Sequence, residues 1–199
     1  MIERWLSKCF VFGVKNWLRW GKPLLSKTTN TFKPQLSIAS THTFESLEDF
    51  AEWLKAHTKW KGEPLRGLFD TYPSLEHLNW QLDTKGYVED DCDGLAYFAA
   101  VNVIPFCDSP SDSYVVSVIF DPLEVALESF AHAICVFKSG GMWRVISNGE
   151  LDPGKWQTLD EAVLENGACR RDKEALRCVE KRTSDLRLVA SAMVSQPGS

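Results

Sequence analysis

The stretch EDDCDGLAYF, residues 89–98, places one cysteine among four carboxylates where a polar segment turns apolar. A thiolate is the reactive form of cysteine, and a helix N-terminus with a neighbouring imidazolium lowers a thiol pKa from ~8.5 to roughly 3.5–7.5. Cys92 therefore has three interpretations: a catalytic nucleophile, part of a metal loop, or a residue beside an ordinary helix cap.

A metal loop fits this stretch only in part. The first oxygen ligands of an EF-hand-like loop are present at Glu89, Asp91 and Asp93, with Gly94 at the turn. The closing bidentate carboxylate would fall on Ala100, which has no ligand atom. A zinc site from Cys92, His132 and Cys135 is disfavoured, because residues three apart on a strand point to opposite faces. We expect no metal and no cofactor.

The nucleophile interpretation needs a helix start and a base. Asp91 or Asp90 can cap a helix that begins at Cys92, which leaves the Cys92 backbone N–H as an oxyanion donor. His132 lies in a predicted core strand. The other histidines lie in a linker, at a helix end and in an irregular stretch, at His42, His57 and His77. We expect Cys92 and His132 to form a thiolate–imidazolium ion pair, since the acids alone would oppose a thiolate.

Hydrophobic periodicity supplies the elements that would position these groups. Spacings of three and four predict a helix in residues 43–57 with Thr43 as its cap. A short helix is expected at residues 74–80, within an otherwise irregular segment. The apolar run after Cys92 predicts a buried helix to about Asn102, stopped by Pro105.

Strand patterns follow that helix. The β-rich segments are YVVSVIF, HAICVF and MWRVIS, at residues 114–120, 132–137 and 142–147. The last two are separated by KSGG, a turn signal, so an antiparallel sheet is predicted. Thr158 and Glu161 stand at capping-box spacing, which predicts a return to helix across residues 158–181.

Composition bounds the class of protein. The 199 residues suffice for one domain, and the net charge of −5 argues against a nucleic-acid binder. Six cysteines without a CxxC pair indicate reduced thiols and a cytoplasmic protein. No apolar run approaches the ~18 residues of a membrane span.

Charge is unevenly distributed: residues 1–40 carry +6 and the remainder −11. Residues 1–26 are predicted to form a basic amphipathic helix, and residues 27–40 a linker. The folded domain is expected over residues 41–190, with a disordered tail at 191–199. The N-terminal helix has two interpretations, a packed helix with a solvated basic face or an interfacial contact with an anionic membrane or a protein.

Residues 75–150 resemble a known family. DDCDGLA before an apolar helix, HAICVF, a glycine turn and WRVISN are similar to the core of the transglutaminase-like, papain-related cysteine enzymes. The gap of 40 residues between Cys92 and His132 suits the compact arrangement of transglutaminase-like enzymes. The resemblance implies an α+β fold, in which a helix bearing Cys92 packs on an antiparallel sheet that carries His132 and Asn148.

The same resemblance assigns roles and marks departures. Cys92 would be the nucleophile, His132 the base and acid, and Asn148 the group that orients the imidazole. The usual Asp aligns with Ser147, so either Asn148 serves after a one-residue strand shift or the triad is degraded. Further departures are Asp90 in place of Gly and Gly94 in place of Asp. Chain position suggests Trp80 or Gln81 as a side-chain oxyanion donor.

The function expected on these grounds is that of a cysteine hydrolase. It would cleave a peptide or isopeptide amide bond through a thioester, with a peptide or protein as substrate and no nucleic acid. The alternative is a catalytically inactive binding or structural module of the same fold.

Overall fold

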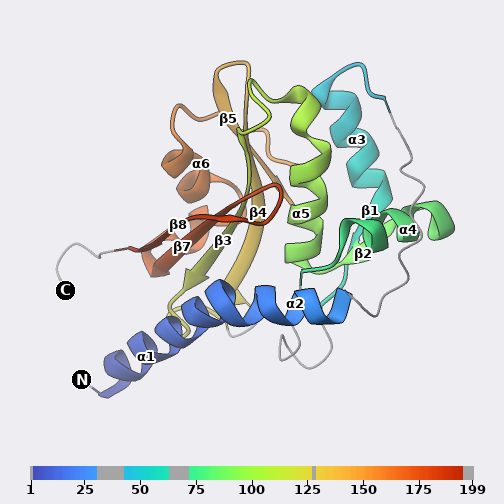
Figure 1. The fold of residues 1–199 in the computed structure, drawn as a ribbon. Coiled ribbons are helices and arrows are strands. Elements are labelled where there is room, and N and C mark those ends of the chain that lie inside the picture. Colours follow the sequence, from blue (N-terminus) through green and yellow to red (C-terminus); the bar gives the residue numbers. More distant parts are fainter. Residues whose placement is uncertain (1, 31–42, 63–71, 127–128, 195–199) are drawn as a thin grey trace.

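The computed structural model describes residues 2–30, 43–62, 72–126 and 129–194. Within these ranges the chain forms an α+β fold, as predicted (Figure 1). The larger sheet is antiparallel throughout and has the order β6-β5-β4-β3-β7-β8. In that order, its strands are Glu150–Leu151, Met142–Ser147, Ala131–Ser139, Ser113–Phe120, Leu176–Thr183 and Leu188–Met193.

Helices surround this sheet. The first helical segments are α1 (Ile2–Asn16), the π-helical turn η1 (Trp17–Gly21) and α2 (Lys22–Asn30). The domain helices are α3 (Leu47–His57), α4 (Leu75–Lys85), α5 (Cys92–Asn102) and α6 (Leu159–Glu165), with short turns η2 (Ile104–Phe106) and η4 (Arg170–Ala175). A small parallel sheet joins β1 (Thr58–Trp60) to β2 (Val88–Asp90) and so leads the chain into α5.

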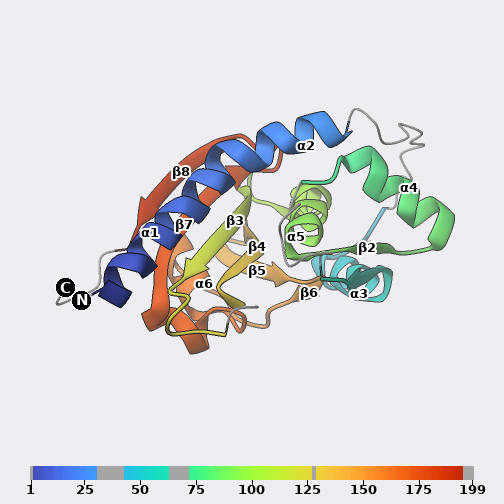
Figure 2. The same cartoon turned by 90° about the horizontal axis from the view of Figure 1, so that it is seen from below.

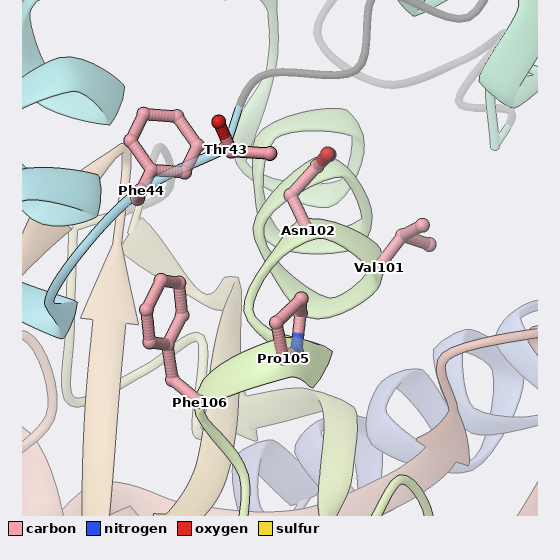
Figure 3. A pocket seen from close by; sticks show the side chains of 6 residues that line it. All are labelled: Thr43, Phe44, Val101, Asn102, Pro105 and Phe106. Carbon is pink, nitrogen blue, oxygen red and sulfur yellow. The ribbon is translucent and has the colours of Figure 1, made fainter.

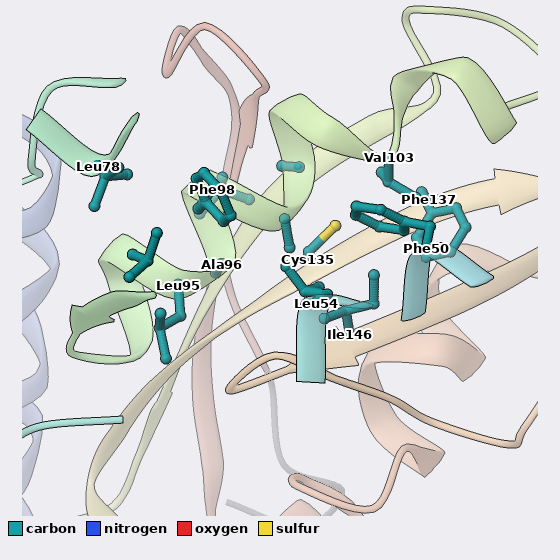
Figure 4. Packing of buried hydrophobic residues seen from close by; sticks show 14 of the residues in the cluster. Phe50, Leu54, Leu78, Leu95, Ala96, Phe98, Val103, Cys135, Phe137 and Ile146 are labelled. Carbon is teal, nitrogen blue, oxygen red and sulfur yellow. The ribbon is translucent and has the colours of Figure 1, made fainter. Parts of the chain in front are cut away.

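Alternation along β4 explains the layers. Ala133, Cys135 and Phe137 belong to the cluster that includes the buried face of α5, shown in Figure 4. Ile134 and Val136 belong to the cluster beneath α6, on the other face. Because successive strand residues point to opposite faces, a near-continuous apolar strand serves two cores at once.

The N-terminal helices pack on the domain. Figure 2 shows α1 running along β7, with α2 continuing past the end of that strand toward α4. Val11 and Leu18 form a buried cluster with Ile119 of β3 and Cys178 of β7. This agrees with the packed-helix interpretation, but helix continues to Asn30, through residues 27–30 where a linker was predicted. The rest of that predicted linker, including His42, lies outside the described residues.

Most sequence-based elements are found. The three predicted strands are β3, β4 and β5, and Thr158 with Glu161 forms the predicted capping box at α6. The predicted helix at 74–80 is the start of α4. One detail is corrected. Ser46 rather than Thr43 caps α3, because its side chain accepts the Asp49 N–H.

The C-terminal region also differs from the prediction. Residues 176–181, expected to be helical, lie in β7, and β8 runs to Met193, inside the segment expected to be a tail. The buried positions of β7 include Glu180 and Arg182, which form an ion pair at 2.6 Å. Hydropathy therefore does not display the period of two that the strand has.

Candidate functional site

Asp91 starts the helix that presents Cys92. Its backbone is extended, and its side chain accepts the N–H groups of Asp93 and Gly94 at 3.0 and 3.1 Å. The predicted cap is therefore confirmed. The cap engages the second and third amides of α5, so the amide of Cys92, which is the first, is not part of it. A sulfur at this position lies at the positive end of the helix dipole.

Asp90 and Gly94, on either side of the start of this helix, fit each other. The Asp90 carboxylate accepts the N–H of Asp91 at 2.9 Å. A Cβ atom built on Gly94 would lie 2.5 Å from Asp90 Cγ. An aspartate at position 90 thus requires glycine at position 94, because any side chain there would overlap the carboxyl group.

The Cys92 thiol is neutral in this setting. The residue keeps some exposure to solvent, but protein atoms surround its sulfur. Burial raises its pKa well above the ordinary value, and the charges of Asp93 and Asp91 raise it further. The backbone amide of Ala133 and the Lys22 ammonium act in the opposite direction and are outweighed. The predicted thiolate is therefore corrected to a buried thiol beside two acids.

His132 lies near the start of β4, one residue before Ala133, whose backbone amide contacts the Cys92 sulfur. Its Nε2 is 2.9 Å from Ser147 Oγ. Burial lowers the His132 pKa, which Asp93 partly opposes, so the imidazole is neutral rather than the predicted imidazolium. Paired residues of β4 and β5 end at Cys135 and Ile146. Both side chains thus occupy the point where β5 leaves β4.

Asn148 does not reach the place predicted for it. It is exposed, with φ of 49°, and with Gly149 at φ 83° it forms the two-residue turn between β5 and β6. Asparagine and glycine tolerate these left-handed conformations, which such hairpins require. Ser147, the residue before it, stands beside His132 instead. The one-residue shift that would bring Asn148 to the imidazole does not occur.

Lys22 is a site residue that sequence reasoning missed. Its ammonium forms an ion pair with Asp93, the residue after Cys92. The side chain is fully buried, and Nζ lies 4.4 Å from the centre of the Tyr72 ring. A cation–π contact and a carboxylate both favour a buried ammonium. The solvated basic face predicted for residues 1–26 would have included Lys22, and nothing in the helical periodicity distinguishes it from its exposed neighbours.

The two suggested oxyanion donors have structural contacts. The Gln81 side chain is buried, and its carboxamide oxygen accepts the N–H of Glu89 at 3.0 Å, which fixes β2 against α4. Trp80 stacks on His77, with ring centres 5.7 Å apart. Gln81 therefore holds the strand that leads into the Asp91 cap, and Trp80 packs within its own helix.

A cavity of about 280 Å³ lies at the opposite end of α5 (Figure 3). Its lining residues are Thr43, Phe44, Val101, Asn102, Pro105 and Phe106. Eleven residues of helix separate the two ends, roughly 15 Å at 1.5 Å per residue. The lining contains no titratable side chain, so this cavity is not the place where Cys92 or His132 would act.

Two kinds of site are not found in the described residues. No group of three or more His, Cys, Asp or Glu side chains is arranged to hold a metal ion, and no helix has the length and apolarity to cross a membrane. In comparisons with protein-family models, curated proteins and solved structures, nothing matches the chain.

Proposed function

We propose that this protein is a cysteine hydrolase that cleaves an amide bond through a thioester intermediate. The observation that supports it best is the approach of the Cys92 sulfur to the start of β4. The sulfur of Cys92, the first residue of α5, lies against the backbone amide of Ala133, and the residue before Ala133 is His132, whose Nε2 is 2.9 Å from Ser147 Oγ. Nucleophile, base and orienting group of this kind are the components of acyl transfer.

The reaction starts from a neutral pair. The Cys92 sulfur attacks the carbonyl carbon while its proton passes to His132 Nδ1, the ring nitrogen that Ser147 does not hold. The amide of Cys92 donates to the oxyanion that forms. His132 then returns the proton to the leaving nitrogen as the C–N bond breaks, leaving a thioester. Water attacks the thioester with His132 as base, which releases the acid and restores the thiol.

Ser147 holds the imidazole in one orientation, but its hydroxyl carries no charge. A carboxylate at this place would stabilise the imidazolium that forms during attack, whereas a hydroxyl gives only a neutral hydrogen bond. We therefore expect slow turnover, with Ser147 rather than Asn148 as the positioning residue. A peptide or protein is the substrate class we propose, and six free cysteines suit a reducing, cytoplasmic compartment.

Trapping the acyl-enzyme tests this proposal. The full chain is incubated with p-nitrophenyl esters and p-nitroanilides of short peptides, and intact mass is recorded together with nitrophenol or nitroaniline release. We expect an acyl adduct on Cys92 that Cys92→Ala abolishes and Cys107→Ala retains. Ser147→Asp should speed release several-fold through imidazolium stabilisation, and Ser147→Ala should slow it.

The inactive module remains a second candidate, favoured by one observation: burial and two carboxylates raise the pKa of Cys92. A fold that kept its cysteine as a small core residue would have this character. Absence of any adduct on the wild type and on Ser147→Asp, in protein shown to be folded by its thermal transition, favours the module and rejects the hydrolase.

A further inference from the structure

The N-terminal helices have one face that binds the domain. Ser7 Oγ donates to Asp121 at 2.6 Å, and Arg182 donates to the Leu18 carbonyl at 2.8 Å. Val11 and Leu18 are buried between these bonds. Polar and apolar contacts of this kind hold the helix at a fixed rotation, so its opposite face has a defined composition.

That opposite face is apolar and exposed. Of the eleven large hydrophobic side chains that are exposed in the described residues, six lie on this segment. They are Trp5 at 64%, Leu6 at 53%, Phe12 at 63%, Trp20 at 66%, Leu24 at 69% and, at the edge of the face where its ring also contacts Phe130 of the domain, Phe10 at 41%. We call this set the aromatic face. A concentration of exposed aromatic residues on one helix marks an interaction surface, whereas scattered ones do not.

Basic side chains flank the aromatic face. With ~100° of rotation per α-helical residue, Lys8 and Lys15 of α1 fall on one narrow band between the docked face and the aromatic face. Lys8 and Arg19 are exposed, and the Arg19 guanidinium lies 5.0 Å from the centre of the Trp20 ring. Residues 5–26 contain no acidic residue. Any partner of this surface must therefore be apolar at its centre and negatively charged beside it.

We propose that the aromatic face binds the surface of an anionic membrane, with the helix lying in the interface plane. Tryptophan and phenylalanine seat in the headgroup region, and lysine and arginine at the flank reach lipid phosphates. A second copy of the chain is a poor partner for this surface, because pairing two such helices would bring their basic flanks together. The docked face stays on the domain, so binding needs no rearrangement.

Vesicle co-sedimentation of the full chain tests the proposal, with phosphatidylcholine vesicles that contain or lack phosphatidylserine. We expect binding only with the anionic lipid and release by added salt. Phe12→Ser with Trp20→Ser should weaken binding at least tenfold. Lys8→Gln with Arg19→Gln should weaken it roughly tenfold or more, at about 1 kcal/mol for each charge lost.

Trp60 and Leu123, each 60% exposed outside the helix, provide matched controls. Trp60→Ser with Leu123→Ser should bind as the wild type does, and Cys92→Ala should as well, because the proposal is independent of the hydrolase. Equal loss in the control pair, or equal binding to neutral vesicles, would overturn it. So would a dimer in light scattering that Phe12→Ser with Trp20→Ser dissociates, since the aromatic face would then be a contact between copies.

Discussion

Two cysteines, Cys92 and Cys107, bracket α5 and share much of their surroundings. Both are partly buried, and both pack against the same core. Burial is the main cause that raises the pKa of each thiol, and two nearby acids raise it further. The acids are Asp93 and Asp91 at Cys92, and Asp112 and Asp108 at Cys107. The pKa of Cys107 rises to about 12.

What separates the two thiols is their hydrogen-bond partners. Cys107 donates to the carbonyl of Val103 at 3.5 Å, a contact that stabilises the protonated form. Cys92 faces the Ala133 amide and Lys22, which favour the thiolate. Burial and neighbouring acids are therefore common to both cysteines. The direction in which their neighbours donate differs, so Cys107 is an internal control for Cys92.

Among the variants considered, replacement of Lys22 at the Cys92 end of α5 should lower the stability of the protein most. Lys22→Met leaves Asp93 buried with its charge unpaired, and we expect a loss of about 3–5 kcal/mol in the free energy of unfolding. Thermal denaturation measures this as a fall of roughly 10 °C. Lys8→Met, at an exposed position, should change little. Restoration of most of the loss by Asp93→Asn would identify the unpaired charge as the cause, and an unchanged transition in Lys22→Met would reject the pair.

Gly94 comes next. Gly94→Ala should destabilise the protein by about 1–3 kcal/mol, because the new Cβ overlaps the Asp90 carboxyl group. Gly13 is a matched helical glycine with no atom within 4 Å of an added Cβ, so Gly13→Ala should gain up to ~1 kcal/mol. A double-mutant cycle with Asp90→Gly, measured by urea denaturation, should recover most of the Gly94→Ala loss. Additive effects would contradict the coupling.

Alkylation compares the two thiols directly. Iodoacetamide should label Cys92 about tenfold faster than Cys107, a difference of about 1.4 kcal/mol, because the Ala133 amide and Lys22 stabilise its thiolate. Both pKa values are raised, so both rates should keep rising with pH through about 9, without the plateau near pH 6–8 that an ion pair gives. Peptide mass spectrometry measures each site. Equal rates at the two cysteines would remove the distinction.

Filling the cavity beyond Phe106 should have the smallest effect. Val101→Phe adds volume to an apolar space at the Cys107 end, and we expect stability to change by no more than about 1 kcal/mol. The labelling rate of Cys92 should stay as it is, since roughly 15 Å of helix intervenes. A changed Cys92 rate in a variant with an unchanged thermal transition would show that the two ends communicate.

The start of α5 and strands β3 to β5 were predictable because local chemistry determines them. Asp91 caps where a capping residue precedes an apolar run, and KSGG makes the turn between two β-rich segments. The backbone preferences of these residues act over a few positions. A single sequence therefore contains the information.

Predictions were wrong where burial contradicts hydropathy. Lys22 is buried because Asp93, far along the chain, is its partner. Arg182 is buried between Glu180, two residues back in β7, and the distant carbonyl of Leu18. Hydropathy in a sequence window predicts neither burial. Burial of polar side chains is also why β7 and the packing of α2 were not predicted.

The residue that orients the imidazole was predicted wrongly for a different reason. Asparagine resembles the expected amide group, but the turn geometry places Asn148 in the loop and leaves the preceding hydroxyl at the imidazole.

The π-helical turn between α1 and α2 makes the N-terminal segment sensitive to its length. The N–H of Lys22 donates to the carbonyl of Trp17, five residues back, so each residue of this turn advances by less than an α-helical residue. Gly21 permits the turn, because a Cβ there would lie 2.2 Å from the Trp17 ring.

A one-residue deletion within Trp17–Gly21 would rotate one half of the segment by ~100° against the other. Either Val11 would leave its place against Ile119, or Lys22 would turn away from Asp93. Natural variation in this segment should therefore tolerate exchanges of side chain far better than insertions or deletions.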